Sequence, residues 1–346
     1  MSLIHHTYNQ NNEKVNKMLN YSDIILKHKK SVVLSRDGCD IFTYIGNKKF
    51  ASPVCCSNMK SILNRDICKI FDDRNWFYVY HRIDGIFDVE RFVWDANDRK
   101  TDQWCYCGKL KEFNTISISV GIGEDWCNLI NRLYIERLRV DYFTIDVALS
   151  YNDNIIPVIN KIKEKYPNSY LIVGNGCIPE WISWLENLGV NCAKIGIGVS
   201  KSCRTRQYTG FGSSTVSSLI DCVNSTKTID IMSDGGLTVD NNGEVWIGDI
   251  NKSLVLGADF IMTGAAFSKC IDSPSIINGY FGNASEQAKQ SKKHIEGTKL
   301  QIETNGLTIS QMCDLISDSI KSGISYAGGK DLSAFKSVKW DILHSH

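Results

Sequence analysis

The chain has 346 residues, a formal net charge of +1 and 43% hydrophobic residues, with 13 cysteines. A near-neutral chain creates no bulk field that would attract nucleic acid or a membrane surface, and no apolar run is long enough to span a bilayer. The odd number and irregular spacing of the cysteines are typical of free thiols in a reducing compartment, so we expect a cytoplasmic protein. Cys105 and Cys107 have no second ligand pair at zinc spacing nearby, so we interpret them as structural.

From about residue 50 onward, short apolar segments alternate with amphipathic ones. Several of the apolar segments have no polar face, as is typical of strands buried on both faces of a parallel sheet. The predicted strands cover 50–56, 76–81, 115–120, 142–147, 170–174, 193–198, 228–233 and 260–263. The predicted helices cover 125–140, 155–166, 179–188, 215–223 and 252–257.

Eight strands in alternation with helices predict an α/β fold, a closed (β/α)8 TIM barrel, as a single domain over 1–346. A doubly wound open sheet is the alternative. The first 48 or so residues form an N-terminal extension in this prediction. TIM barrels carry their chemistry at the carboxyl ends of the strands, and polar or glycine residues follow nearly every predicted strand. These residues include Ser57, Met59, Arg82, Asp146, Asn175, Asp234 and Gly264.

One cysteine, Cys203, lies in a glycine-rich turn after the sixth predicted strand. Arg204, Thr205 and Arg206 follow it directly. Cationic neighbours favour the thiolate, which is the form of cysteine that attacks electrophiles. The alternative interpretation is a buried structural cysteine beside a solvated basic loop. The residues downstream favour the catalytic interpretation.

Small residues after the last two strands predict a phosphate site, as is usual in this class of barrel. The residues in question are Gly235, Gly236, Gly264 and Ala265, with Lys201 as a nearby positive charge. Asp234 precedes the glycine pair and could accept hydrogen bonds from two ribose hydroxyls. A purine nucleoside monophosphate would then place its base toward Cys203, whose thiolate could add to an electron-poor ring carbon. Thr205 and Glu296 are the candidates for acid–base work on such an adduct.

Several motifs in the right order resemble the IMP dehydrogenase/GMP reductase family. They lie at 21–26, 57–59, 194–212, 234–236, 248–250, 257–264, 280–282, 296–297 and 325–329. The resemblance spans about 20–335 and is closest to the GMP reductase branch. The chain has no CBS-type insertion after His81, and its active-site flap over about 282–306 is short, with neither Arg nor Tyr between 282 and 296. Both features differ from the pattern of the dehydrogenase branch.

The resemblance implies that Cys203 attacks C2 of GMP, or of dGMP, to form a thioether. Thr205 and Glu296 would assist protonation and loss of ammonia, and NADPH would supply the hydride that yields IMP. Two alternatives stay open. One is oxidation of IMP to XMP with NAD, and the other is a catalytically silent barrel that binds purine nucleotides. The family also implies a homotetramer.

Further site residues are implied by the same resemblance. For the nucleotide they are Ser57, Met59, Lys201, Ser202, Asp234, Gly235, Gly236, Gly264, Ala265, Tyr280, Gly282, Asn283 and Ala284. For the cofactor they are Arg82, Asp146, Val147, Ala148, Asn175 and Tyr326. Ser200 stands at a family glycine and alters the motif for a monovalent cation, so we assign no metal here and keep K⁺ near Gly196 and Gly198 only as an alternative. Residues 237–247 are an insertion relative to the family pattern.

Overall fold

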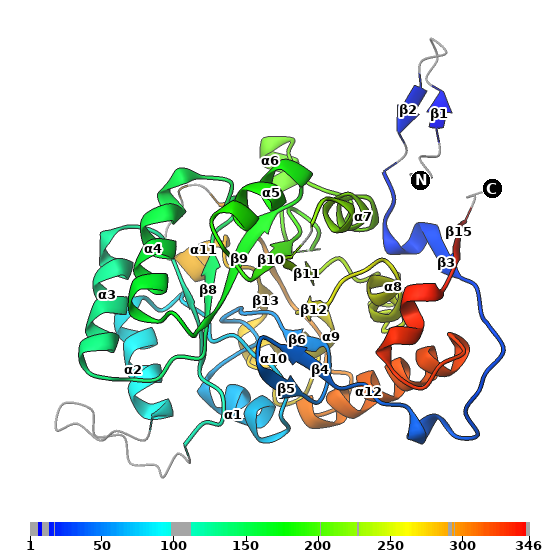
Figure 1. The fold of residues 1–346 in the computed structure, drawn as a ribbon, viewed down its shortest axis with the longest axis horizontal. Helices are drawn as coiled ribbons and strands as arrows, with labels where there is room; N and C mark the ends of the chain where they lie inside the picture. Colours follow the sequence, from blue (N-terminus) through cyan, green and yellow to red (C-terminus); the bar gives the residue numbers. More distant parts are fainter. Residues whose placement is uncertain are drawn as a thin grey trace.

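A computed structural model describes residues 6–8, 14–16, 18–97, 112–200, 202–226, 228–289, 293 and 295–343 (Figure 1). At its centre lies one parallel sheet in the order β6-β12-β11-β10-β9-β8-β7. Because the first strand pairs with the last, the sheet curls into a TIM-like barrel. Its strands are β6 (Val54–Cys56), β7 (Ser117–Val120), β8 (Tyr142–Asp146), β9 (Tyr170–Gly176), β10 (Cys192–Ile195), β11 (Asp230–Asp234) and β12 (Phe260–Thr263).

The second predicted strand, 76–81, forms the eighth wall of the barrel but is barely paired. Within the described residues, its one bridge joins Tyr80 to Ile118 in parallel. The Tyr80 N–H donates to the Ser117 carbonyl at 3.0 Å, and the Ser119 N–H donates to the Tyr80 carbonyl at 2.8 Å. The hydroxyl of Tyr78 donates to the Thr115 carbonyl, so a side chain takes the place of a ladder bond there. The prediction that 76–81 lies in the barrel wall is confirmed, whereas the prediction that it forms a regular strand is wrong.

The first predicted strand, 50–56, is divided in two. Its start belongs to a hairpin of β4 (Thr43–Ile45) and β5 (Lys48–Phe50), and only its end forms β6. Pro53 interrupts the run because it has no N–H to donate to a ladder. Phe50 instead turns into the barrel, where its ring lies 5.4 Å from that of Phe77. The hairpin therefore packs against the barrel interior.

Helices surround the sheet (Figure 1). The major ones are α1 (Arg65–Asp73), α2 (Ile86–Ala96), α3 (Glu124–Ile135), α4 (Ile156–Lys165), α5 (Pro179–Asn187), α7 (Thr215–Ser225), α8 (Asp249–Val255) and α12 (Ile309–Tyr326). The short ones are α6 (Thr205–Thr209), α9 (Ala265–Ser268), α10 (Ser275–Asn278) and α11 (Glu286–Lys289). The predicted helix over 125–140 stops early because Arg137 has a left-handed φ of 54°. No helix in the described ranges is long and apolar enough to cross a membrane.

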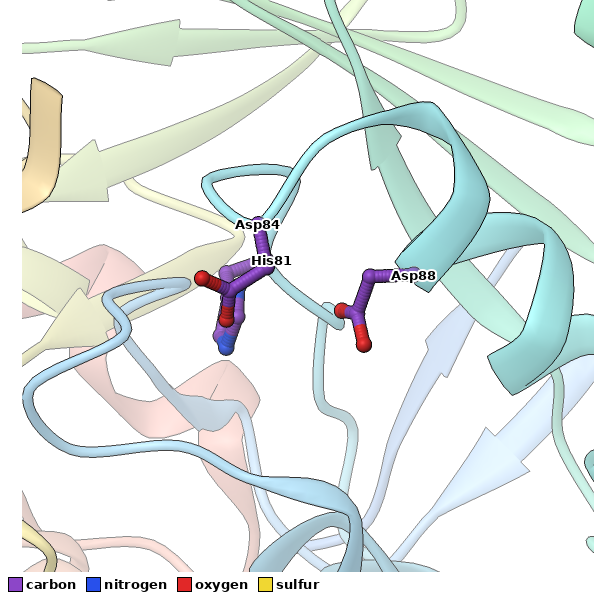
Figure 2. Close-up of side chains that lie close together, drawn as sticks. All are labelled: His81, Asp84 and Asp88. Carbon is purple, nitrogen blue, oxygen red and sulfur yellow. The ribbon is translucent and has the colours of Figure 1, made fainter. Parts of the chain in front are cut away.

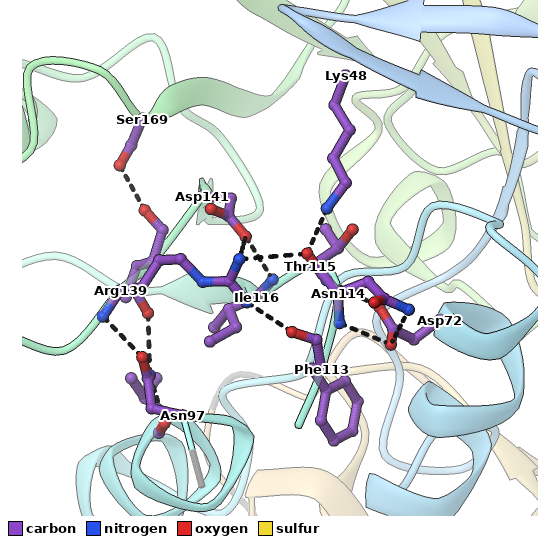
Figure 3. Close-up of polar contacts among 12 residues, drawn as sticks. Lys48, Asp72, Asn97, Phe113, Asn114, Thr115, Ile116, Arg139, Asp141 and Ser169 are labelled. Carbon is purple, nitrogen blue, oxygen red and sulfur yellow. Dashed lines mark hydrogen bonds and ion pairs between the residues drawn. The ribbon is translucent and has the colours of Figure 1, made fainter. Parts of the chain in front are cut away.

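A polar network fixes the amino-terminal ends of β7 and β8 (Figure 3). The carboxylate of Asp72 accepts the N–H groups of Asn114 and Thr115 at 2.9 and 2.8 Å. Asp141 accepts the Ile116 N–H at 2.8 Å, and Arg139 donates to the Phe113 carbonyl at 2.5 Å. These bonds satisfy backbone groups that would otherwise lie unpaired at the start of the sheet.

The N-terminal extension is anchored to the barrel. Its β3 (Ile24–Leu26) pairs antiparallel with β15 (Trp340–Ile342) near the C-terminus. Tyr21 is fully buried, and its hydroxyl lies 3.0 and 2.6 Å from the hydroxyls of Ser233 and Ser253. The hairpin of β1 (His6–Tyr8) and β2 (Lys14–Asn16) stands away from the barrel (Figure 1). A second small hairpin, β13 (Tyr280–Phe281) with β14 (Lys299–Leu300), frames the flap.

Candidate active site

A cavity of about 630 Å³ lies at the carboxyl ends of the barrel strands. It gathers nearly all the predicted site residues, although they come from every part of the chain. Its lining includes Ser57, Met59, Arg82, Asp146, Val147, Ala148, Asn175, Ser202, Cys203, Thr205, Asp234, Gly235, Gly236, Gly264, Ala265, Tyr280, Gly282, Asn283, Ala284 and Glu296. Lys201 falls outside the described residues. Tyr326 lines a separate cavity of about 380 Å³, beside α8 and α12.

Cys203, Thr205 and Glu296 form a continuous hydrogen-bonded chain. The Thr205 hydroxyl donates to Oε2 of Glu296 at 2.7 Å, and Sγ of Cys203 lies 3.2 Å from the Thr205 oxygen. Since the hydroxyl proton points to the carboxylate, the thiol is the donor to Thr205. This arrangement can carry the thiol proton to Glu296 and return it. Cys203 lies in the loop between β10 and α6, Thr205 is the first residue of α6, and Glu296 comes from the flap.

Backbone contacts hold this chain together. The Arg204 N–H donates to the Glu296 carbonyl at 2.6 Å, and Cys203 bridges antiparallel to Gly297. Arg204 and Arg206 themselves are exposed and do not line the cavity. The hydroxyl–carboxylate pair is therefore placed to take the thiol proton, and the flanking arginines lie outside the cavity.

Lys194 is a buried cation that sequence analysis did not single out. Only 2% of it is exposed. Its Nζ donates to Asp234 and Asn175 at 2.6 Å each and lies 3.3 Å from Asp146. Burial alone would lower its pKa, but Asp234 and Asp146 outweigh burial and raise the pKa to about 12. Lys194 is thus a permanent positive charge beneath the cavity.

The contacts of Asp234 fit the predicted ribose-binding role. Lys194 and Asn175 both donate to its Oδ2, at 2.6 and 2.9 Å. Among the described residues, no donor is hydrogen-bonded to its Oδ1, which stays able to accept hydrogen bonds from a ligand.

Arg82 and Asp146 meet on the side of the cavity formed by β8. The Nε of Arg82 donates to the Asp146 carbonyl at 2.8 Å. Burial would raise the pKa of Asp146, yet Lys194 and Arg82 together lower it, so the carboxylate is charged. In the described part of the chain, the guanidinium of Arg82 forms no ion pair with a carboxylate. It therefore offers free donors to an anionic group in the cavity.

The glycine pair of the predicted phosphate site forms a tight turn that packs against α7, and its contact with a phosphate stays a prediction. Gly235 and Gly236 have left-handed φ values of 77° and 78°. A Cβ on Gly236 would lie 2.2 Å from Oγ1 of Thr215, so no side chain fits there.

The carbonyl of Gly196 accepts the Asn175 amide at 2.7 Å. That oxygen is already hydrogen-bonded within the chain, and a potassium site nearby stays only an alternative.

Lys269 is a second cation that sequence analysis missed. It follows α9 directly, is half-buried and lines the cavity close to Gly264 and Ala265. No carboxylate in the described residues forms an ion pair with it. A lone lysine beside predicted phosphate-binding glycines is a recognisable signal, but the sequence alone does not show that it faces the cavity.

The insertion over 237–247 covers the same end of the cavity. Val239 bridges antiparallel to Val245, and the Asp240 N–H donates to the Glu244 carbonyl at 2.9 Å, so the insertion is a small hairpin. A Cβ on Gly243 would lie 3.0 Å from Nζ of Lys269, so the hairpin rests on that side chain. Its residues on the cavity wall are Leu237, Val239, Gly243 and Val245.

Comparison with known proteins places this geometry in context. Residues 18–343 match the IMP dehydrogenase / GMP reductase domain. The chain is 35% identical over 337 residues to a GMP reductase of Oceanobacillus iheyensis, which covers 94% of this chain and 96% of the relative. It is 34% identical over 338 residues to a GMP reductase of Helicobacter pylori, and 35% identical over 338 residues to one of Pediococcus pentosaceus. Each of these two alignments covers 94% of this chain and 97% of the relative.

Proposed function

The chain belongs to the IMP dehydrogenase/GMP reductase family, and we propose that it reduces GMP to IMP, or dGMP to dIMP, with release of ammonia. The observation that carries the proposal is the hydrogen-bonded chain from Cys203 through Thr205 to Glu296 on the cavity wall. It combines a nucleophile with a group that can accept and return its proton.

The proposed reaction begins with addition of the Cys203 sulfur to C2 of the purine. The thiol proton passes through Thr205 to Glu296 as the C–S bond forms. The proton then returns through Thr205 to the 2-amino group, which leaves as ammonia when its C–N bond breaks. The purine remains attached to Cys203 as a thioether. Reduction at C2 breaks the C–S bond, and the sulfur leaves as a thiolate that takes up a proton.

The family implies a nicotinamide cofactor, and NADPH is our specific proposal. When bound, the reduced nicotinamide supplies the hydride for C2. Asp146, Val147, Ala148 and Asn175 form the neighbouring wall of the cavity. The unpaired guanidinium of Arg82 fits an anionic group such as the additional phosphate of NADPH. Tyr326 does not lie on this cavity, and its predicted contact with the cofactor stays a prediction.

The direct test mixes the purified protein with NADPH and a panel of purine monophosphates. We expect GMP or dGMP to cause loss of NADPH absorbance together with stoichiometric ammonia. Reduction of NAD in the presence of IMP, with no reaction of GMP, would instead identify a dehydrogenase. Stabilisation by a nucleotide without turnover in either direction would identify a binding protein.

Lys269→Met should weaken binding of the nucleotide phosphate. A charge-assisted hydrogen bond contributes about 1.5–3 kcal/mol, so we expect the KM for GMP to rise roughly 10–100-fold with little change in kcat. Steady-state kinetics measure both constants. Lys299→Met is the matched control, because Lys299 is exposed on β14 and does not line the cavity. An unchanged KM in Lys269→Met would contradict the proposed phosphate contact.

The assembly and the compartment are further proposals. We propose a homotetramer, as the family resemblance implies, and a cytoplasmic location, as the cysteine pattern favours. Sedimentation equilibrium of the full chain with its 39.0 kDa subunit mass tests the assembly. A monomer at assay concentration would rule it out.

A further inference from the structure

Three potential metal ligands converge outside the catalytic cavity (Figure 2). They are His81, at the end of the eighth barrel wall, Asp84, in the turn that follows, and Asp88, in the first turn of α2. One nitrogen of His81 and one oxygen of each carboxylate all lie within 4.8 Å of one another. None of the three side chains is among the described residues that line the cavity.

His81 provides the observation that points to a ligand. It is 3% exposed, and its Nδ1 has no hydrogen-bond partner among the described residues. A buried polar atom without a partner is rare and costly. Its ring is fixed by stacking on Tyr80, with centroids 4.8 Å apart.

The charges at the cluster also favour a cation. Two carboxylates lie beside one imidazole, and Lys60 pairs with one of them, Asp84. Asp88 accepts the Tyr80 hydroxyl at 2.8 Å through Oδ2. That bond leaves its other oxygen able to bind a metal and orients the carboxylate, as outer hydrogen bonds do in metal sites.

We propose that His81, Asp84 and Asp88 bind a divalent transition-metal ion. One imidazole nitrogen and two carboxylate oxygens suit Mn²⁺ or Zn²⁺, with water completing the coordination. Metal–ligand bonds of about 2.0–2.2 Å bring ligand atoms to roughly 3–4 Å from each other, so the three groups draw together on binding. Lys60 pairs with Oδ1 of Asp84, and its positive charge beside the site opposes binding of the ion.

The site adjoins the catalytic cavity through the backbone. Arg82 directly follows His81, and its Nε holds the Asp146 carbonyl at 2.8 Å. An ion that links His81 to Asp84 and Asp88 would fix the turn that carries Arg82. The ion is thus structural in this proposal and takes no part in the reaction.

The test titrates the full chain, free of nucleotides, with Mn²⁺ and follows the electron paramagnetic resonance signal of free Mn²⁺. Mn²⁺ is preferred to Zn²⁺ because thiolates bind manganese poorly, and eleven free cysteines lie in the described residues. We expect one Mn²⁺ per chain in the wild type. Asp84→Asn and Asp88→Asn should each weaken binding at least about tenfold.

Two further variants sharpen the test. Lys60→Gln should bind Mn²⁺ more tightly, because it removes the opposing positive charge. Asp73→Asn is the matched control: Asp73 is an exposed, ion-paired acid on α1 and should leave the affinity unchanged. Circular dichroism and thermal melting verify that each variant is folded. The proposal would be overturned if the wild type bound no stoichiometric Mn²⁺. It would also be overturned if folded Asp84→Asn and Asp88→Asn bound Mn²⁺ with the affinity of the wild type.

Discussion

Cys203→Ala is expected to abolish reduction of GMP while leaving the affinity for GMP nearly unchanged. The variant keeps the cavity wall that we propose contacts the nucleotide, and it loses the sulfur that would form the proposed thioether. Removal of a catalytic nucleophile typically lowers kcat by about 10⁴-fold or more. NADPH oxidation kinetics measure the rate, and isothermal titration with GMP measures the affinity.

Controls separate loss of the nucleophile from loss of a thiol. Cys177→Ala removes another half-buried cysteine that does not line the cavity, and it should retain normal kinetics. Glu296→Gln should also lower kcat. Combined with Cys203→Ala it should add little, because both residues act in one proton relay. Normal turnover in Cys203→Ala would show that no thioether forms.

Lys194→Met is expected to be the most destabilising substitution in the site. It leaves Asp234 and Asp146 facing each other at the cavity floor without the cation that neutralises them. Removal of one partner from a buried ion pair typically costs about 3–5 kcal/mol in the free energy of unfolding. Denaturant unfolding at pH 7 measures the difference.

A surface ion pair supplies the control for this prediction. Lys27 pairs with Asp341, and both side chains are about half exposed. Lys27→Met should cost roughly 1 kcal/mol or less, because exposed pairs contribute little. An equal decrease in the free energy of unfolding in Lys27→Met and Lys194→Met would contradict the role given to Lys194.

The pH dependence gives an independent check. Asp146 has a lowered pKa in the folded protein, so it contributes stability above its unfolded pKa, and that stability is lost as the pH falls through its folded pKa. Lys194 has a raised pKa, so its contribution is lost only as the pH rises through about 12. In Lys194→Met the cation that lowers the pKa of Asp146 is absent and burial raises that pKa, so Asp146 of the variant takes up a proton at higher pH than in the wild type. The deficit in the free energy of unfolding should therefore narrow as the pH falls from about 7 toward about 4. A deficit of constant size would contradict this account.

The barrel could be predicted because its strands and helices differ in hydrophobic period. Where a predicted strand or helix differs from the structure, the cause is a local feature that the hydrophobic period does not reveal. Pro53 divides the first predicted strand, and Arg137 ends α3 early. The segment at 76–81 satisfies part of its hydrogen bonding through a tyrosine side chain, which no periodic pattern reveals.

The site was predictable where its residues lie close in sequence or follow a strand. Cys203 and Thr205 are two positions apart, whereas Glu296 lies 91 residues from Thr205, and only the family resemblance could suggest their pairing. Lys194 was missed because it lies within an otherwise apolar strand. Its role depends on Asp146 and Asp234, which come from two other strands and meet it only when the sheet curls.

The buried lysine has a consequence for recognition. Asn175 and Asp234 are held by Lys194 before any nucleotide arrives. If Asp234 binds the sugar as we propose, its carboxylate is already ordered, and little conformational entropy is lost when the sugar binds. Selectivity between ribose and deoxyribose then depends on the number of hydrogen bonds that a rigid carboxylate accepts, and not on adjustment of the protein to its ligand.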